Sequence, residues 1–159
     1  MTESAANRTL ALQLYENLLN AWNRRNAADF ADLFGESGSC VGFDGSEMSG
    51  QAEIANNLGA IFGSHVTPRY IAKVREVRSL GETVMLVRAV AGMVPPGESE
   101  INSDLNAIQN LVVVNDGNGA QVALFQNTPA AFHGRPELRE SLTEELSEAA
   151  RAGLVVEVG

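Results

Sequence analysis

Apolar residues in the first third of the chain recur at the three- and four-residue spacing of amphipathic helices. The longest such pattern covers residues 7–24, and its apolar side carries Leu10, Leu14, Leu18 and Ala21. The same spacing predicts a short helix over about 27–34 and a third helix over about 51–62. A short strand is expected over 39–43, followed by a turn around Asp44-Gly45-Ser46.

The second half of the chain has the pattern of strands separated by turns. Runs rich in Val and Ile predict four strands, over 70–78, 83–93, 106–115 and 121–128. The sequence Asn115 to Gly119 is typical of a tight hairpin turn. A closing helix is expected over 136–152, with Pro136 near its first position. The apolar tail 154–158 either packs against the domain or frays.

Three helices followed by a strongly bent antiparallel sheet predict an α+β fold. The length predicts one domain over 1–159, with a core over about 8–135 and an added C-terminal helix over about 136–152. The strand segments 84–90 and 111–114 are apolar on both faces. We therefore expect both faces of the sheet to be covered, one by helices and the other by a second subunit.

The net charge of the chain limits the classes of partner that it is expected to bind. Its net charge is -9, and no stripe of Lys and Arg offers contacts to phosphates. We therefore expect neither nucleic acid nor an anionic membrane as a partner. Cys40 is the only cysteine, which excludes an intramolecular disulfide. The first residues lack the pattern of a secretory signal, so the expected location is the cytoplasm.

Motifs for metals and nucleotide cofactors are absent from the sequence. His65 and His133 are the only histidines, and neither has a metal-ligand partner at a usable spacing. Gly117-Asn118-Gly119 resembles the start of a dinucleotide fingerprint, but it lacks the third glycine and lies in a predicted hairpin. We expect no metal, no nicotinamide and no flavin.

Several segments between residues 8 and 137 together resemble the nuclear transport factor 2-like (SnoaL-like) superfamily. They include Trp22 to Ala27, Phe30 to Phe34, Gly50 to Ile54 and Ala107 to Gln109. The segment Leu124 to Glu137 is the most specific, and it resembles the SgcJ/EcaC-type branch, which includes small proteins of enediyne biosynthesis. The resemblance implies a conical barrel in which a curved antiparallel sheet wraps around three N-terminal helices, with a ligand between the sheet and the helices. It also implies a homodimer.

The superfamily that the chain resembles includes ketosteroid isomerase. Alignment with that enzyme shows which residues of this chain stand at the positions of its catalytic groups. The catalytic base of the isomerase falls at Gly42, and its tyrosine falls at Leu18. Its second carboxyl donor falls at Asn110. Asp44 has the same strand parity as Gly42 and is the candidate general base; the alternative is a turn residue before Gly45.

Six residues are expected to line one cavity. They are Tyr15, Trp22, Asp44, Arg88, Asn110 and Gln126. Alternatives stay open for Trp22, which also suits a plain core position, and for Arg88, which also suits a structural ion pair or an exposed edge. We expect Asn110 and Gln126 to hydrogen-bond each other, water or the ligand, because buried amides without partners are costly.

Three functions remain open at this point. The first is a binding protein for a polyketide- or polyene-like small molecule, or a cofactor-free accessory enzyme, in natural-product biosynthesis of the enediyne type. Other enzymes of that pathway are then expected partners. The second is a polyketide cyclase, isomerase or dehydratase that uses Asp44 or a histidine as general base. The third is a scaffolding domain without a ligand. Fold alone does not decide among them.

Overall fold

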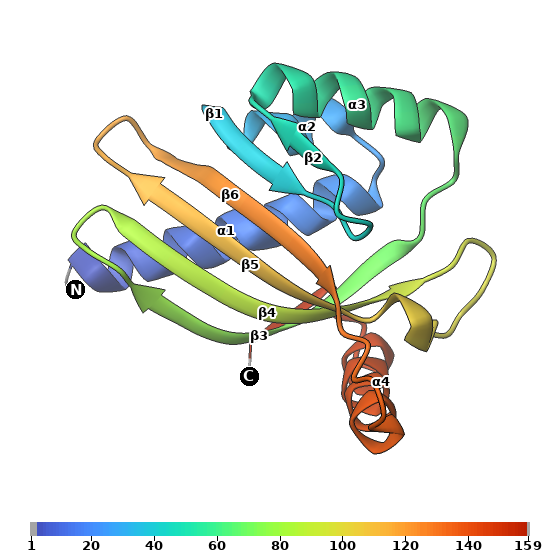
Figure 1. Ribbon diagram of the computed structural model, residues 1–159. Coiled ribbons are helices and arrows are strands. Elements are labelled where there is room, and N and C mark those ends of the chain that lie inside the picture. Colours follow the sequence, from blue (N-terminus) through green and yellow to red (C-terminus); the bar gives the residue numbers. More distant parts are fainter. Residues whose placement is uncertain (1–2, 159) are drawn as a thin grey trace.

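A curved sheet with helices on both of its faces forms the molecule (Figure 1), and the computed structural model describes residues 3–158. The elements follow in the order α1 (Glu3–Asn23), α2 (Ala27–Asp32), β1 (Phe34–Val41), β2 (Glu47–Ser49), α3 (Gln51–Ser64), β3 (Arg69–Ser79), β4 (Val84–Val94), the 3-10 turn η1 (Ser103–Leu105), β5 (Ala107–Asn115), β6 (Ala120–Pro129), α4 (Pro136–Arg151) and β7 (Val156–Val158). The predicted α+β class and the cone-shaped architecture are confirmed.

The sheet has the strand order β2-β1-β6-β5-β4-β3-β7. Strands β3 to β6 pair antiparallel, as expected, but β1 runs parallel to β6 and β7 runs parallel to β3. The sheet is therefore mixed and not purely antiparallel. In each parallel pair, a long stretch of chain that includes a helix separates the two strands in the sequence, which permits the parallel pairing. The apolar tail packs as strand β7 and does not fray.

The segment after α2 differs from the sequence-based expectation. Strand β1 begins at Phe34, whereas the sequence predicted a helix to residue 34 and a strand from 39. The pairing of β1 with β6 shifts register between Phe34 and Ser39. At Gly38, an added Cβ would lie 2.7 Å from the carbonyl oxygen of Val122, so only glycine fits this close approach. The segment that the sequence assigned to the end of the helix is thus the start of an irregular strand.

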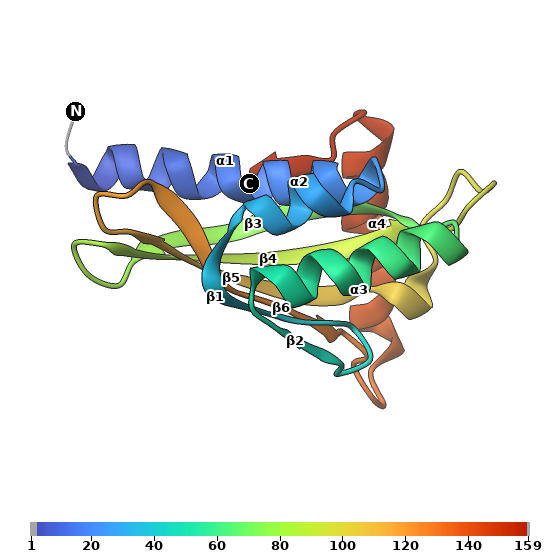
Figure 2. The same cartoon turned by 90° about the horizontal axis from the view of Figure 1, so that it is seen from above.

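Helix α1 lies along the concave face of the sheet (Figure 2), and its apolar stripe packs into the main core there. Ala11, Tyr15, Leu18 and Leu19 are fully buried there against inward side chains of β3 and β4. Helices α2 and α3 pack together beside β1 and β2. The top view shows α2 and α3 alongside the C-terminal part of α1.

Helix α4 packs on the opposite, outer face of the sheet. Leu142 and Leu146 contact Val90 of β4 there. An ion pair from Glu145 to Arg75 holds the helix to β3, and Lys73 approaches the same carboxylate at 3.1 Å. The hydrogen bond from Arg75 is the main cause that lowers the pKa of Glu145 to about 2.

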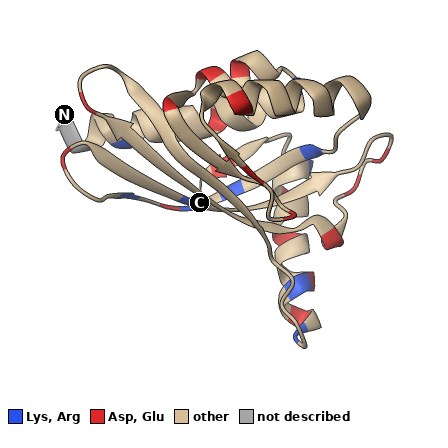
Figure 3. Cartoon of the chain, turned by 45° about the horizontal axis from the view of Figure 1, so that its top comes forward, with Lys and Arg blue, Asp and Glu red and all other residues tan. Residues whose placement is uncertain are grey.

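The charged residues lie mainly outside the central strands (Figure 3). Strands β4, β5 and β6 carry a single charged residue, Arg88, and most of the charge lies on the helices, the loops and β3. Among the described residues, no helix is both long and apolar enough to cross a membrane.

Candidate functional site

A cavity of about 590 Å³ opens between the concave face of the sheet and the helices α2 and α3. Its apolar wall consists mainly of Trp22, Phe30, Leu58, Ile61, Met93 and Phe125. Its polar groups include Cys40, Asp44, Glu47, Asn57, Tyr70 and Asn127. None of the described residues that line it is a Lys, an Arg or a His. The cavity has the size and the apolar wall of a small-molecule site.

The last turn of α1 positions one wall of this cavity. The indole Nε1 of Trp22 donates to the carbonyl oxygen of Pro68 at 2.9 Å. Its ring packs against Phe62 and Tyr70 at centroid distances of 5.2 and 5.3 Å. Asn23 bonds the backbone of Tyr70 twice, because its Oδ1 accepts from N at 2.7 Å and its Nδ2 donates to O at 3.1 Å. The start of β3, and with it Tyr70, is therefore fixed by α1.

A row of buried side chains connects the core to the cavity by hydrogen bonds. The hydroxyl of Tyr15 donates to Oε1 of Gln109 at 2.6 Å, and Nε2 of Gln109 donates to Oδ1 of Asn127 at 3.2 Å. Nδ2 of Asn127 then donates to the hydroxyl of Tyr70 at 2.9 Å. All four side chains are at most 5% exposed, and burial raises the pKa of both phenols well above the ordinary value. We call Tyr15, Gln109, Asn127 and Tyr70 the buried relay.

Asp44 lies at the mouth of the cavity and is exposed. Its Oδ1 accepts from the backbone N of Ser46 at 2.9 Å, the geometry of a turn-forming aspartate. That hydrogen bond lowers the pKa of the Asp44 carboxyl below its ordinary value. A lowered pKa makes the carboxylate a weaker base.

Four of the six residues expected at the cavity do not line it, and three of these four lie on the outer face of the sheet. Arg88, Asn110 and Gln126 are paired in one row across β4, β5 and β6, on the outer face of the sheet. Arg88 is exposed and forms an ion pair with Glu76 at 3.2 Å, which matches its alternative structural role. These three residues therefore do not line the cavity that Trp22 and Asp44 line.

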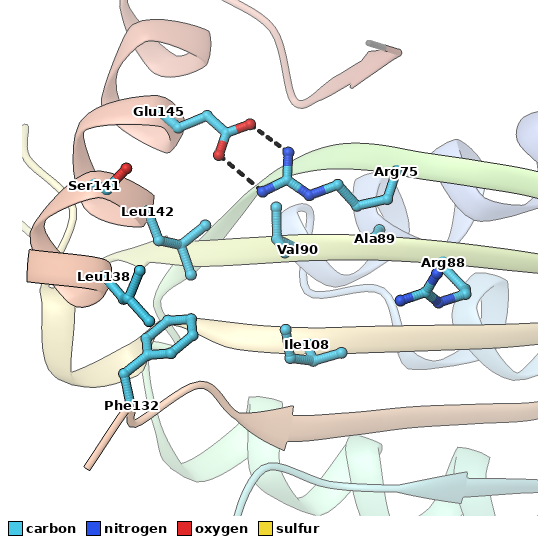
Figure 4. A pocket seen from close by; sticks show the side chains of 10 residues that line it. All are labelled: Arg75, Arg88, Ala89, Val90, Ile108, Phe132, Leu138, Ser141, Leu142 and Glu145. Carbon is cyan, nitrogen blue, oxygen red and sulfur yellow. Dashed lines mark hydrogen bonds and ion pairs between the residues drawn. The ribbon is translucent and has the colours of Figure 1, made fainter. Parts of the chain in front are cut away.

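A second, smaller pocket of about 320 Å³ lies on the outer face beside α4. Figure 4 shows Val90, Ile108, Phe132 and Leu142 as its apolar floor, with Arg88 beyond it along the sheet. The pair Arg75–Glu145 closes its other side, so the cations of this pocket already have carboxylate partners.

The amides that face the inside of the sheet lie one residue away from the two amides that were expected there, and this shift has a simple cause. Gln109 and Asn127 are the neighbours of Asn110 and Gln126, and they take the inner face. Residues of either parity along β5 are mainly apolar, so alternation alone did not show which face is concave. Tyr15, which was also expected in the lining, does not line the cavity; it is fully buried and is the first residue of the relay. Tyr70 lies near the start of β3, a strand that was predicted, but no motif in the sequence marks it as a cavity residue.

The two histidines lie away from the cavity. His65 follows α3, where its Nδ1 lies 3.0 Å from Oγ of Ser64, and His133 lies on the outer side near Phe132. Within residues 3–158, no three His, Cys, Asp or Glu side chains are grouped so that they could hold a metal ion.

No protein-family model and no curated protein matches this chain, but solved structures do. A domain of unknown function with a cystatin-like fold from Nostoc punctiforme PCC 73102 is 24% identical, with a TM-score of 0.73 over 95% of this chain and 91% of that chain. A ketosteroid isomerase-like protein from Erwinia carotovora atroseptica SCRI1043 is 15% identical, with a TM-score of 0.61 over 77% of this chain and 95% of the other. An NTF2-like protein of unknown function from Pseudomonas putida KT2440 is 13% identical, with a TM-score of 0.63 over 78% of this chain and 87% of the other. The chain therefore has the NTF2-like fold.

Proposed function

We propose that the protein binds a small, uncharged and mainly apolar molecule in the cavity beside Trp22. The observation that carries this proposal is the lining itself: an aromatic and aliphatic wall, acidic groups at Asp44 and Glu47, and no Lys, Arg or His among the described lining residues. Apolar surface favours an apolar ligand, and the acidic groups disfavour an anionic one. The NTF2-like fold supports a ligand or isomerase-type role for such a cavity.

The resemblance of the closing segment to the SgcJ/EcaC-type branch supports a finer proposal. The ligand would be polyketide- or polyene-like, and the protein would act in natural-product biosynthesis of the enediyne type. There it would be a binding protein or a cofactor-free accessory enzyme. A fused-ring or conjugated molecule suits the aromatic wall formed by Trp22, Phe30 and Phe125.

The alternative of a cyclase, isomerase or dehydratase needs a general base at the cavity. Asp44 is exposed, holds the turn at Ser46 and has a lowered pKa, and all three features disfavour it in that role. Neither histidine lines the cavity. Binding without proton abstraction is therefore the better supported function.

Binding should be visible in the fluorescence of Trp22, the only tryptophan of the chain. Titration with anthraquinone, an uncharged tricyclic compound, should quench this fluorescence saturably, because the ligand would lie against the indole. Anthraquinone-2-carboxylate should bind at least about tenfold more weakly, because its charge would meet Asp44 and Glu47 without a cationic partner. Fluorescence titration at constant ionic strength measures both affinities.

A matched pair of variants tests whether the cavity is the binding site. Ile61 lines the cavity and is 38% exposed, so lysine there should be tolerated by the fold but should weaken anthraquinone binding. Val66 is 65% exposed and lies outside the lining, so Val66→Lys should bind like the wild type. Equal affinities for Ile61→Lys and the wild type would remove the cavity as the site.

We also propose that the protein is a homodimer paired through the outer face of its sheet. Leu86, Val112 and Leu124 are paired in a row across β4, β5 and β6 there and remain half-buried. Helix α4 covers the part of this face around Val90, and Leu86, Val112 and Leu124 lie outside its apolar contacts. A twofold contact would bury the row against itself.

Light scattering at micromolar concentration should therefore give twice the mass of one chain. Val112→Glu places a charge in the middle of the row and should shift the protein to the monomer. Leu80→Glu, at an exposed position beside the β3–β4 turn, should leave the dimer intact. A monomeric wild-type protein would contradict this assignment.

A further inference from the structure

The hydroxyl of Tyr70 is the last group of the buried relay, and Tyr70 lines the cavity together with Asn127, the residue that donates to this hydroxyl. It accepts a hydrogen bond from Nδ2 of Asn127, and it donates none to any residue that the structure describes. A phenol has one proton to donate. That proton is the free donor at the end of a chain of three hydrogen bonds.

The relay has two possible directions, because an amide can exchange its oxygen and nitrogen without a change of shape. In the observed direction, Tyr15 donates to Gln109, Gln109 to Asn127, and Asn127 to Tyr70. In the reverse direction, Tyr70 would donate to Asn127, and Gln109 would donate to the oxygen of Tyr15.

The burial of Tyr15 decides between the two directions. Tyr15 is 0% exposed, so in the reverse direction its proton would be buried without an acceptor. An unsatisfied buried donor is costly, whereas the observed direction leaves the unused proton at the cavity, where a ligand or water reaches it. Tyr15 therefore holds Tyr70 in the donating state from the far end of the relay.

We propose that the hydroxyl of Tyr70 donates a hydrogen bond to an uncharged acceptor oxygen of the ligand, such as the carbonyl oxygen of a ketone or a quinone. This inference rests on the proposed function, since it names the polar group of the molecule bound in the cavity. A carboxylate or a phosphate would also accept from Tyr70, but it would lie in a lining that contains Asp44 and Glu47 and no described cation. Desolvation raises the pKa of Tyr70, so the phenol stays protonated and keeps its donor at neutral and mildly alkaline pH.

Two probes of the same shape separate this hydrogen bond from apolar burial. 2-Acetylnaphthalene carries a carbonyl group, and 2-isopropenylnaphthalene carries a methylene group in its place. The quantity to compare is the ratio of their dissociation constants, measured by quenching of Trp22. In Tyr70→Phe the preference for the ketone should fall about fivefold or more from the wild-type ratio, as expected for the loss of one hydrogen bond. The affinity for the hydrocarbon should change little.

Two further variants separate the relay from a general change of the cavity. Tyr15→Phe removes the group that fixes the direction of the relay, so the ketone preference should fall to a value between those of the wild type and Tyr70→Phe, although residue 15 does not line the cavity. Val66 lies outside the lining and Val66→Lys leaves the relay intact, so the wild-type ratio should be kept.

The possible outcomes distinguish this inference from the function on which it rests. If neither probe binds, the proposed function fails and the inference fails with it. If both probes bind but Tyr70→Phe keeps the wild-type ratio, the cavity binds ligands and the role of Tyr70 is wrong. If Tyr15→Phe keeps the wild-type ratio while Tyr70→Phe lowers it, Tyr70 donates to the ligand and the positioning role of Tyr15 is wrong.

Discussion

Replacement of Gln109 by leucine should lower the free energy of unfolding by about 2–5 kcal/mol, although the two side chains have similar volumes. Gln109 is 0% exposed and has a partner at each end of its amide. Leucine would leave the hydroxyl of Tyr15 without an acceptor and Oδ1 of Asn127 without a donor, both inside the core. Each unsatisfied group costs about 1–3 kcal/mol. Urea unfolding followed by the fluorescence of Trp22 measures the loss.

The adjacent residue supplies a matched control. Asn110 lies on the outer face and is half-buried, so Asn110→Leu should change the free energy of unfolding by less than about 1 kcal/mol. Addition of Tyr15→Phe to Gln109→Leu should recover part of the loss, because it removes one of the two orphaned groups. Equal losses for the variants at 109 and 110 would mean that the relay does not stabilise the fold.

The contrast between these neighbours shows how much of the fold the sequence could predict. Helices α1 and α3 and strands β3 to β6 follow from local sequence, because their apolar residues recur at helical spacing or form Val- and Ile-rich runs bounded by turns. The strands β2 and β7 are three residues long and gain their order from pairing with β1 and β3. The first residues of β1 were not predicted as a strand, since the close approach of Gly38 to Val122 is a contact between distant segments.

The candidate site was harder to predict than the fold. Helical spacing placed Trp22 on the inner side correctly, and the turn at Asp44 was evident from its sequence. The amides were assigned to the wrong faces of β5 and β6, because a strand that is apolar on both faces carries no sign of which face is concave. Their true partners, Tyr15 and Tyr70, are 94 and 57 residues away from Gln109 and Asn127 respectively, so the relay exists only in the folded chain.

Phe30→Ala is the second substitution with a large expected effect, a loss of about 3–5 kcal/mol in the free energy of unfolding. Phe30 is 1% exposed, and its ring lies 6.3 Å from that of Trp22, 5.6 Å from that of Phe34 and 6.4 Å from that of Phe125. These partners belong to α1, β1 and β6, so this one side chain joins three elements. Its loss removes contacts from all three.

Phe43→Ala is the matched control for this loss, because Phe43 also lines the cavity but is only half-buried near the turn at Asp44. It should cost at most about 1 kcal/mol. Since Phe30 lines the cavity as well, the space that it leaves should join the ligand site. Naphthalene should therefore raise the melting temperature of Phe30→Ala more than that of the wild type, because bound ligand stabilises the native state by mass action. A loss below about 1 kcal/mol, or equal thermal shifts with naphthalene, would show that Phe30 is not the side chain that joins the core to the cavity.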